Sequence, residues 1–216
     1  EKLNPEFTFN YGADVLYYFT LGNIAGSLNL DYYRTEFSNK IIPDYDTDPT
    51  EVIFANLNGN AFSNVFQTEA NISLMRNFDL KLAYKLIDLQ YENNGINYQQ
   101  PFNSTHRFFS SLSFSPINKS WSISSGLQWF GVQQLPSTAT NPLIYQRPSE
   151  SESYTMVNAQ FNKYFDYFEL YAGIENILDF TQGFPIISAN DPFGQYFDTS
   201  YIWGPTKGRE FYFGFR

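Results

Sequence analysis

Apolar side chains occur at every second position in nine segments of this chain, and polar or small residues stand between them. In the first segment Phe7, Val15 and Phe19 occupy odd positions, whereas Asn10 and Asp14 occupy even ones. The other eight segments are centred on 28–32, 66–74, 80–86, 108–114, 121–129, 157–161, 168–174 and 211–215. A period of two is that of a β-strand whose two faces meet different surroundings, and no proline interrupts these segments. The pattern predicts nine strands, each with one apolar face.

The connections between these segments alternate between short turns and long polar loops. The short ones fall at 22–25, 76–79, 117–120 and 165–167. The long ones fall around 38–64, 92–105, 132–152 and 178–206. Short turns on one side and long loops on the other are typical of bacterial outer-membrane barrels, whose long loops are extracellular. We therefore predict an all-β, transmembrane antiparallel β-barrel, with long loops extracellular and the C-terminus periplasmic.

The size and placement of the apolar residues fit a membrane barrel better than a helix bundle or a soluble sheet. The longest apolar run, Val15–Phe19, has five residues, whereas a membrane helix needs about 20 and a membrane strand only about 9–11. Aromatic residues make up 20% of the chain and gather near the ends of the apolar faces, as at Trp121 and Trp129. This is the arrangement of interfacial girdles. A soluble β-sandwich, used as an adhesin or lectin, also alternates and stays as an alternative.

If the fold is a barrel, the shared parity of the segments predicts which side chains contact lipid. One residue from each of eight segments represents that face: Phe7, Leu30, Ile72, Leu82, Leu112, Leu127, Leu170 and Phe213. Nine strands alone would leave two unpaired edges, which lipid does not tolerate. Residues 1–5 also resemble an internal segment of a protein and contain no signal peptide. We expect further strands on the same or another polypeptide, and no closed barrel from this chain alone.

Charge and composition exclude several functions. A net charge of -9 and a pI near 4.5 argue against nucleic-acid binding, which needs Lys and Arg patches. The single histidine, His106, has no recognisable nucleophile near it, and no catalytic motif is present. We predict no enzyme and no cofactor. One His, two Met and no Cys also disfavour a soft-metal site.

Two stretches near the C-terminus carry a family resemblance. Residues 173–179, Gly-Ile-Glu-Asn-Ile-Leu-Asp, resemble the end of the penultimate strand in TonB-dependent outer-membrane receptors, and 204–215 are similar to their final strand. Asn190–Gly194 and Trp203–Pro205 resemble receptors of the Bacteroidetes type. The resemblance covers essentially the whole chain, so we interpret 1–216 as one domain, the C-terminal part of such a receptor barrel.

The resemblance implies a 22-stranded barrel, of which this chain supplies about the last nine strands. It implies import of a scarce nutrient, such as a metal chelate or other small ligand, with energy passed on by TonB. The implied partners are outer-membrane lipid, the plug domain and N-terminal strands of the same receptor, TonB through that N-terminal part, and the ligand. A passive porin or structural barrel is the alternative, and siderophore, cobalamin and saccharide all stay open as substrates.

Three groups of residues are candidates for sites. The inward charges Glu69, Lys81, Lys85, Glu169 and Glu175 would face the plug, and either pair with it or line water. The loop residues Tyr145, Arg147, Tyr196, Phe197, Tyr201 and Trp203 would either bind ligand or pack the loops together. Alternating carboxylates at Asp44, Asp46 and Asp48 are a weak calcium candidate, since Pro49 follows and no glycine supplies the sharp bend.

The last long loop, 178–206, has an unusual composition for a loop of its length. It is rich in Phe, Tyr, Ile and Trp, which is too apolar for a solvated tail. We therefore expect it to be ordered and to fold back over the extracellular mouth, with Pro185, Pro192 and Pro205 fixing its bends.

Overall fold

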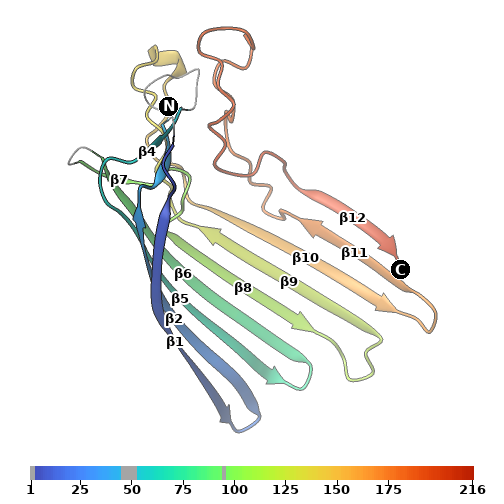
Figure 1. Cartoon of the computed structure of the whole chain (residues 1–216). Helices are drawn as coiled ribbons and strands as arrows, with labels where there is room; N and C mark the ends of the chain where they lie inside the picture. The colour runs from blue at the N-terminus through green and yellow to red at the C-terminus, as the bar shows by residue number, and fades with distance from the viewer. Residues whose placement is uncertain (1–2, 45–52, 94–95) are drawn as a thin grey trace.

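The protein is a curved antiparallel sheet with long loops at one end, seen in a computed structural model that describes residues 3–44, 53–93 and 96–216 (Figure 1). The strands are β1 Phe7–Leu21, β2 Ile24–Ser38, β3 Ile41–Asp44, β4 Ile53–Asn56, β5 Ala61–Met75, β6 Phe78–Asn93, β7 Ile96–Gln99, β8 His106–Phe114, β9 Trp121–Phe130, β10 Tyr154–Tyr164, β11 Glu169–Glu175 and β12 Glu210–Phe215. A single turn of 3-10 helix, η1, covers Leu143–Tyr145. In these three described stretches no helix has the length and apolarity to cross a membrane.

The predicted nine strands are confirmed as one continuous sheet in the order β1-β2-β5-β6-β8-β9-β10-β11-β12. Each neighbour in this order is antiparallel, and short turns join the strands at the end opposite the long loops (Figure 1). Three short strands lie in the loops and were not predicted: β7 pairs with β6, and β3 and β4 form a separate hairpin. β1 and β12 form the two edges of the sheet, as expected for part of a barrel.

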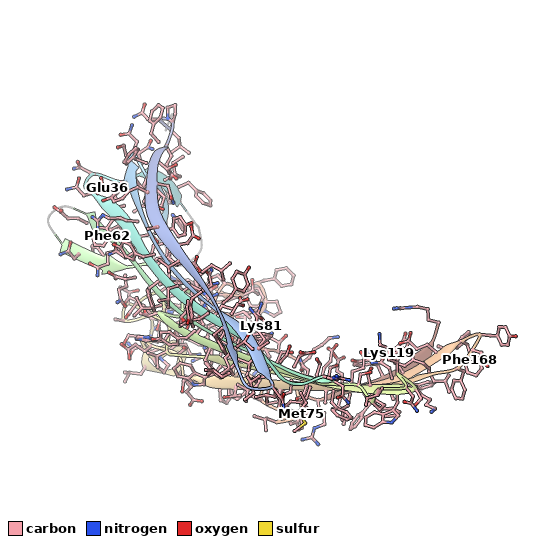
Figure 2. The ribbon with its side chains drawn as sticks, turned by 90° about the horizontal axis from the view of Figure 1, so that it is seen from below. Glu36, Phe62, Met75, Lys81, Lys119 and Phe168 are labelled. Atoms are coloured by element: carbon pink, nitrogen blue, oxygen red, sulfur yellow. The ribbon has the colours of Figure 1, made fainter. Side chains whose placement is uncertain are left out.

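The strand register brings the nine apolar faces onto one side of the sheet. Residues directly opposite in an antiparallel pair point to the same face. One row of such partners runs Leu28, Ala70, Leu82, Ser110, Leu127 and Val157. All eight residues expected to contact lipid share this face. In Figure 2 Met75, which belongs to it, lies on the convex side of the sheet, and Lys81 lies on the concave side.

Charged side chains mark where the apolar face ends. On β6 the outward residues Phe78, Leu80, Leu82, Tyr84 and Leu86 carry no charge, and Asp88 follows. The outward side is therefore free of charge over a stretch of nine residues, from Phe78 to Leu86. A membrane strand needs about 9–11 residues. On β2 the run ends at Arg34, which forms an ion pair with Glu36 (Nε to Oε1, 3.1 Å).

Two of the eight residues expected to contact lipid therefore lie nearer the ends of their strands than the other six. Phe7 is opposite Ser38, beyond Arg34 and Glu36, so it lies outside the uncharged part of the outward face. Leu170 is opposite Lys163, near the short-turn end of the sheet. The face of the sheet was predicted correctly for both residues, and the structure adds their position along the strand.

Buried apolar side chains gather in the loops rather than in the wall. One cluster joins Ile42 and Leu57 of the first long loop to Ala61, Phe37 and Tyr91 at the strand ends. A second cluster, which we call the loop core, consists of Leu135, Ile187 and Tyr201 with Phe102, Tyr145 and Trp203 packed around it. The described part of the wall has no such core, because its apolar face points outward and away from protein neighbours.

Candidate functional site: the inner face and the loop core

The concave face, which we call the inner face, is polar and carries fixed charges. Lys81 on β6 binds Glu69 on β5, with 2.8 Å between Nζ and Oε1. Asn71 donates a second hydrogen bond to the same carboxylate oxygen at 2.9 Å. Four residues along β6 from Lys81, Lys85 stands directly opposite Arg107 of β8. This part of the wall can hold charged groups of either sign because the charges lie away from lipid.

All five inward charges predicted from the sequence lie on this inner face. Besides Glu69, Lys81 and Lys85, these are Glu169 and Glu175 of β11. Glu175 is opposite Glu210 of β12, and Lys207 binds Glu210 with 3.2 Å between Nζ and Oε1. The structure thus brings three of the five together on β5 and β6 and places the other two at opposite ends of β11.

The predicted ligand residue Tyr201 is at the centre of the loop core. Its side chain is only 3% exposed, and its hydroxyl donates a hydrogen bond to the carbonyl oxygen of Pro148 in the neighbouring loop. Burial raises the pKa of the Tyr201 hydroxyl to about 12, although the nearby Arg147 acts in the opposite direction. In this position Tyr201 joins loop 131–153 to loop 176–209.

The other predicted ligand residues surround the same junction. The rings of Tyr145 and Tyr196 stack at a centroid distance of 5.1 Å, one from each loop. Trp203 packs against Phe180 and Tyr154. Arg147 donates from its backbone N–H to Thr138 Oγ1 at 2.7 Å, while its Nε is buried without a partner among the described residues. Phe197 is half-buried on the same loop.

Two buried glutamines that sequence reasoning missed hold this junction: Gln182 links two parts of loop 176–209, and Gln133 joins that loop to loop 131–153. Gln182 Oε1 accepts hydrogen bonds from the backbone N–H groups of Trp203 (2.8 Å) and Gly204 (3.0 Å), and its Nε2 donates to Tyr201 O at 2.8 Å. Gln133 Nε2, from the other loop, donates to Trp203 O at 3.0 Å. A loop glutamine gives no sequence signal of burial. Loop 178–206 therefore has defined packing contacts, and it stands up from the sheet beside loop 131–153 (Figure 1). That it is ordered and folds back over the mouth of a complete barrel stays a prediction.

Replacing Tyr201 with Phe should loosen this junction. The change leaves Pro148 O without its donor, at a cost of about 0.5–1.5 kcal/mol, and we expect faster proteolysis of loops 131–153 and 176–209 in the complete receptor. Tyr167→Phe is the matched control, because Tyr167 is 98% exposed in the β10–β11 turn.

The raised pKa of Tyr201 adds a pH signature to this prediction. The folded state favours the neutral hydroxyl, so its contribution is complete below the ordinary tyrosine pKa of about 10 and is lost as pH rises through about 12. We expect loop cleavage by an alkaline-stable protease to rise over that range in the wild type and to change less in Tyr201→Phe. Equal cleavage of both proteins at every pH would refute the structural role.

Asn176 explains the motif at 173–179 in physical terms. Its side chain is 2% exposed; Nδ2 donates to Phe180 O (2.8 Å) and Lys207 O (3.1 Å), and Oδ1 accepts from Phe180 N (3.1 Å). Its backbone is left-handed, with φ 50°, a conformation that Asn tolerates better than most residues. Three residues later Asp179 Oδ1 accepts from the backbone N–H of Arg209 at 2.7 Å. The motif therefore ties the end of β11 to the start of β12.

Within the described stretches no group of three or more His, Cys, Asp or Glu side chains could hold a metal ion. Of the calcium candidates, Asp46 and Asp48 lie outside the described residues, as does the side chain of Asp44. His106 lies on the outward face, where its Nδ1 is 2.6 Å from the hydroxyl of Tyr84.

Comparison with protein families decides what this wall belongs to. Residues 1–177 match the model described as TonB dependent receptor-like, beta-barrel. This chain belongs to the TonB-dependent receptor β-barrel family.

Solved structures of TonB-dependent receptors share the fold. The copper transporter OprC matches with a TM-score of 0.69 and 15% identity over 100% of this chain and 32% of its own. The ferric-catecholate import receptor Fiu of Escherichia coli K12 matches with a TM-score of 0.65 and 13% identity, over 99% and 28%. FpvA of Pseudomonas aeruginosa, bound to a heterologous pyoverdine and iron, gives 0.62 and 18%, over 97% and 27%.

These matches define the wall as a partial TonB-dependent receptor barrel. The chain spans about a third or less of each of the three neighbours. The family and its structural neighbours are outer-membrane transport receptors rather than enzymes. A comparison with curated proteins gave no match.

Proposed function

We propose that this chain forms the last nine strands of a 22-stranded receptor barrel that imports a scarce nutrient, such as a metal chelate, across the outer membrane. The observation that carries the proposal is the pairing of one uncharged outward face with an inner face bearing fixed charges, in a chain of the TonB-dependent receptor family. The structural neighbours include a ferric-catecholate import receptor and a copper transporter, which supports a metal or metal chelate as cargo.

The proposed orientation places the long loops outside the cell and the short turns, with the C-terminus, in the periplasm. In this orientation the loop core stands at the extracellular mouth. Tyr145, Arg147, Tyr196, Phe197 and Trp203 would then border the ligand vestibule, whereas Tyr201, buried between the loops, would hold them in place. The resemblance of 190–194 and 203–205 supports a receptor of the Bacteroidetes type.

The proposed partners follow from the two faces and the two edges of the sheet. The outward face would contact outer-membrane lipid, and β1 and β12 would pair with the N-terminal strands of the same receptor. Glu69, Lys81, Lys85, Glu169 and Glu175 would face its plug domain. TonB would act through that N-terminal part.

A deletion strain tests the function directly. Cells with and without the complete receptor gene are given radiolabelled ferric chelates, cobalamin and oligosaccharides, each with and without a protonophore. An importer gives saturable uptake of one class that disappears in the deletion strain and with the protonophore. A passive porin instead gives protonophore-resistant uptake and a steady open conductance in planar bilayers, and that result would overturn the proposal.

A further inference from the structure

A hollow on the inner face carries excess positive charge, although the chain as a whole is acidic. The hollow measures about 420 Å³, and its lining residues include Gln67, Lys85, Arg107, Gln128 and Phe130 from β5, β6, β8 and β9. Its charged side chains are Lys81, Lys85 and Arg107 against Glu69, which gives three positive charges minus one negative charge, or +2. The whole chain has 13 basic and 22 acidic residues.

The one carboxylate that lines the hollow is already occupied. Glu69 Oε1 accepts from Lys81 at 2.8 Å and from Asn71 at 2.9 Å. Lys85 and Arg107 are left facing each other in directly opposite positions of β6 and β8. Like charges in such positions are destabilising, and in the described part of the chain no carboxylate pairs with either.

Arg107 uses only part of its hydrogen-bonding capacity within the described stretches. Its Nη2 donates to Asn103 Oδ1 at 3.2 Å, and its guanidinium lies 5.9 Å from the ring centroid of Phe130. Its Nε is buried and has no hydrogen-bond partner among the described residues. An oxygen from outside this segment would therefore bind through the Nη groups of the guanidinium and not through this buried atom.

A second like-charge pair on the inner face shows that charge repetition alone is not the argument. Asp14 and Asp31 are also directly opposite each other. Asp14, however, is exposed, and Asp31 accepts from Asn29 Nδ2 at 2.9 and 3.0 Å. Water and Asn29 satisfy that pair, whereas in the described stretches neither Lys85 nor Arg107 forms an ion pair with a carboxylate.

We propose that Lys85 and Arg107, with the amides of Gln67 and Gln128, form a binding site for one anionic oxygen group, a carboxylate or a phosphate. The guanidinium presents a planar set of donors that matches two oxygens, and the Lys85 ammonium adds a point charge. Two sources offer this chemistry: an acidic side chain from the rest of the receptor inside the lumen, or an anionic group on the cargo. The inference rests on the proposed function only in placing this face in a lumen.

The test uses the complete receptor with inorganic phosphate as the probe, in calorimetric titrations and thermal unfolding. Lys85→Gln removes one charge, Arg107→Lys keeps the charge but loses the planar fork, and Lys119→Gln is the control. Lys119 is exposed in the β8–β9 turn, outside the hollow. If the site is open to cargo, phosphate binds the wild type and Lys119→Gln alike. Its affinity then falls about tenfold in Lys85→Gln, the effect of one charged hydrogen bond.

If a carboxylate of the receptor already fills the site, we expect a different result in the same two measurements. Phosphate then has no effect on the wild type, but Lys85→Gln and Arg107→Lys lower the midpoint of thermal unfolding, and the difference shrinks at high salt. The proposal is overturned if both variants match Lys119→Gln in phosphate binding and in thermal midpoint. If the deletion-strain test shows no saturable, protonophore-sensitive uptake while either of the first two results holds, the proposed function fails and the anion site stands.

Discussion

Leu82→Arg should destabilise the assembled receptor in membranes by about 2–4 kcal/mol, the cost of a cation on the lipid face at the bilayer midplane. Leu82 is the middle one of five uncharged outward residues on β6. Its partners on the same face are Ala70 on β5 and Ser110 on β8, so no charged neighbour draws water to this height. The measurement is equilibrium unfolding in urea of the complete receptor refolded in phospholipid vesicles.

The matched control is the same substitution one residue further along the strand. Ala83→Arg points to the inner face, where Ala83 is directly opposite Glu69 and lines the hollow. We expect a smaller effect than that of Leu82→Arg, because the new charge would face Glu69 and the polar inner face and not lipid. A third variant, Leu170→Arg, tests the height, because Leu170 is opposite Lys163 near the short turns. It should cost about 0–1 kcal/mol. Equal costs at Leu82 and Ala83 would contradict the assignment of the two faces.

The face of each strand could be predicted from the sequence because the two sides of the wall meet different surroundings. Alternation was read separately in each segment, and the register then joined all nine apolar faces without a mismatch, as in the row through Leu82 and Leu127. Even the irregularity between Ser73 and Met75 keeps this agreement, because it returns Met75 to the face of Phe78. Period-two patterns survive such local shifts when lipid penalises any charge on the wrong side.

The height of each residue could not be predicted in the same way. Alternation says which face a side chain takes but not where along the strand the bilayer ends. That limit depends on neighbouring strands, such as the position of Arg34 opposite Tyr11 or of Lys163 opposite Leu170. The four-residue strands β3, β4 and β7 were missed for a related reason, since so short a segment shows too few alternations.

Site residues on the strands were easier to predict from the sequence than site residues in the loops. Inward charges such as Lys81 were found because a charge on a membrane strand has only one tolerable side. Arg107 was missed because the predicted strand began at Phe108, two residues after His106, where the pairing with β6 begins. In the loops, an aromatic such as Tyr201 fits ligand capture and packing equally well by composition. Only its 3% exposure and its bond to Pro148 O distinguish the two.

Asn176→Ala should have a second large effect, on the junction between β11 and β12. The substitution removes three side-chain hydrogen bonds and leaves the carbonyl oxygens of Phe180 and Lys207 without their side-chain donor. Unsatisfied buried groups cost about 1–3 kcal/mol. Alanine must also adopt the left-handed backbone that Asn176 has, at φ 50°, which costs about 1–2 kcal/mol. We expect a total loss of about 2–5 kcal/mol and poor assembly of the edge strand β12.

Two further variants separate these contributions in the same unfolding assay. Asn176→Gly relieves the backbone cost but not the lost hydrogen bonds, so it should recover about 1 kcal/mol relative to alanine. Asn176→Asp keeps an acceptor for Phe180 N but loses the donor to Phe180 O and Lys207 O, and a buried carboxylate beside two carbonyl oxygens should leave it as unstable as alanine or worse. Leu178→Ala is the control, because Leu178 lies in the same turn with its side chain exposed. If Asn176→Ala were no less stable than Leu178→Ala, the 173–179 motif would not be the tie between the last two strands.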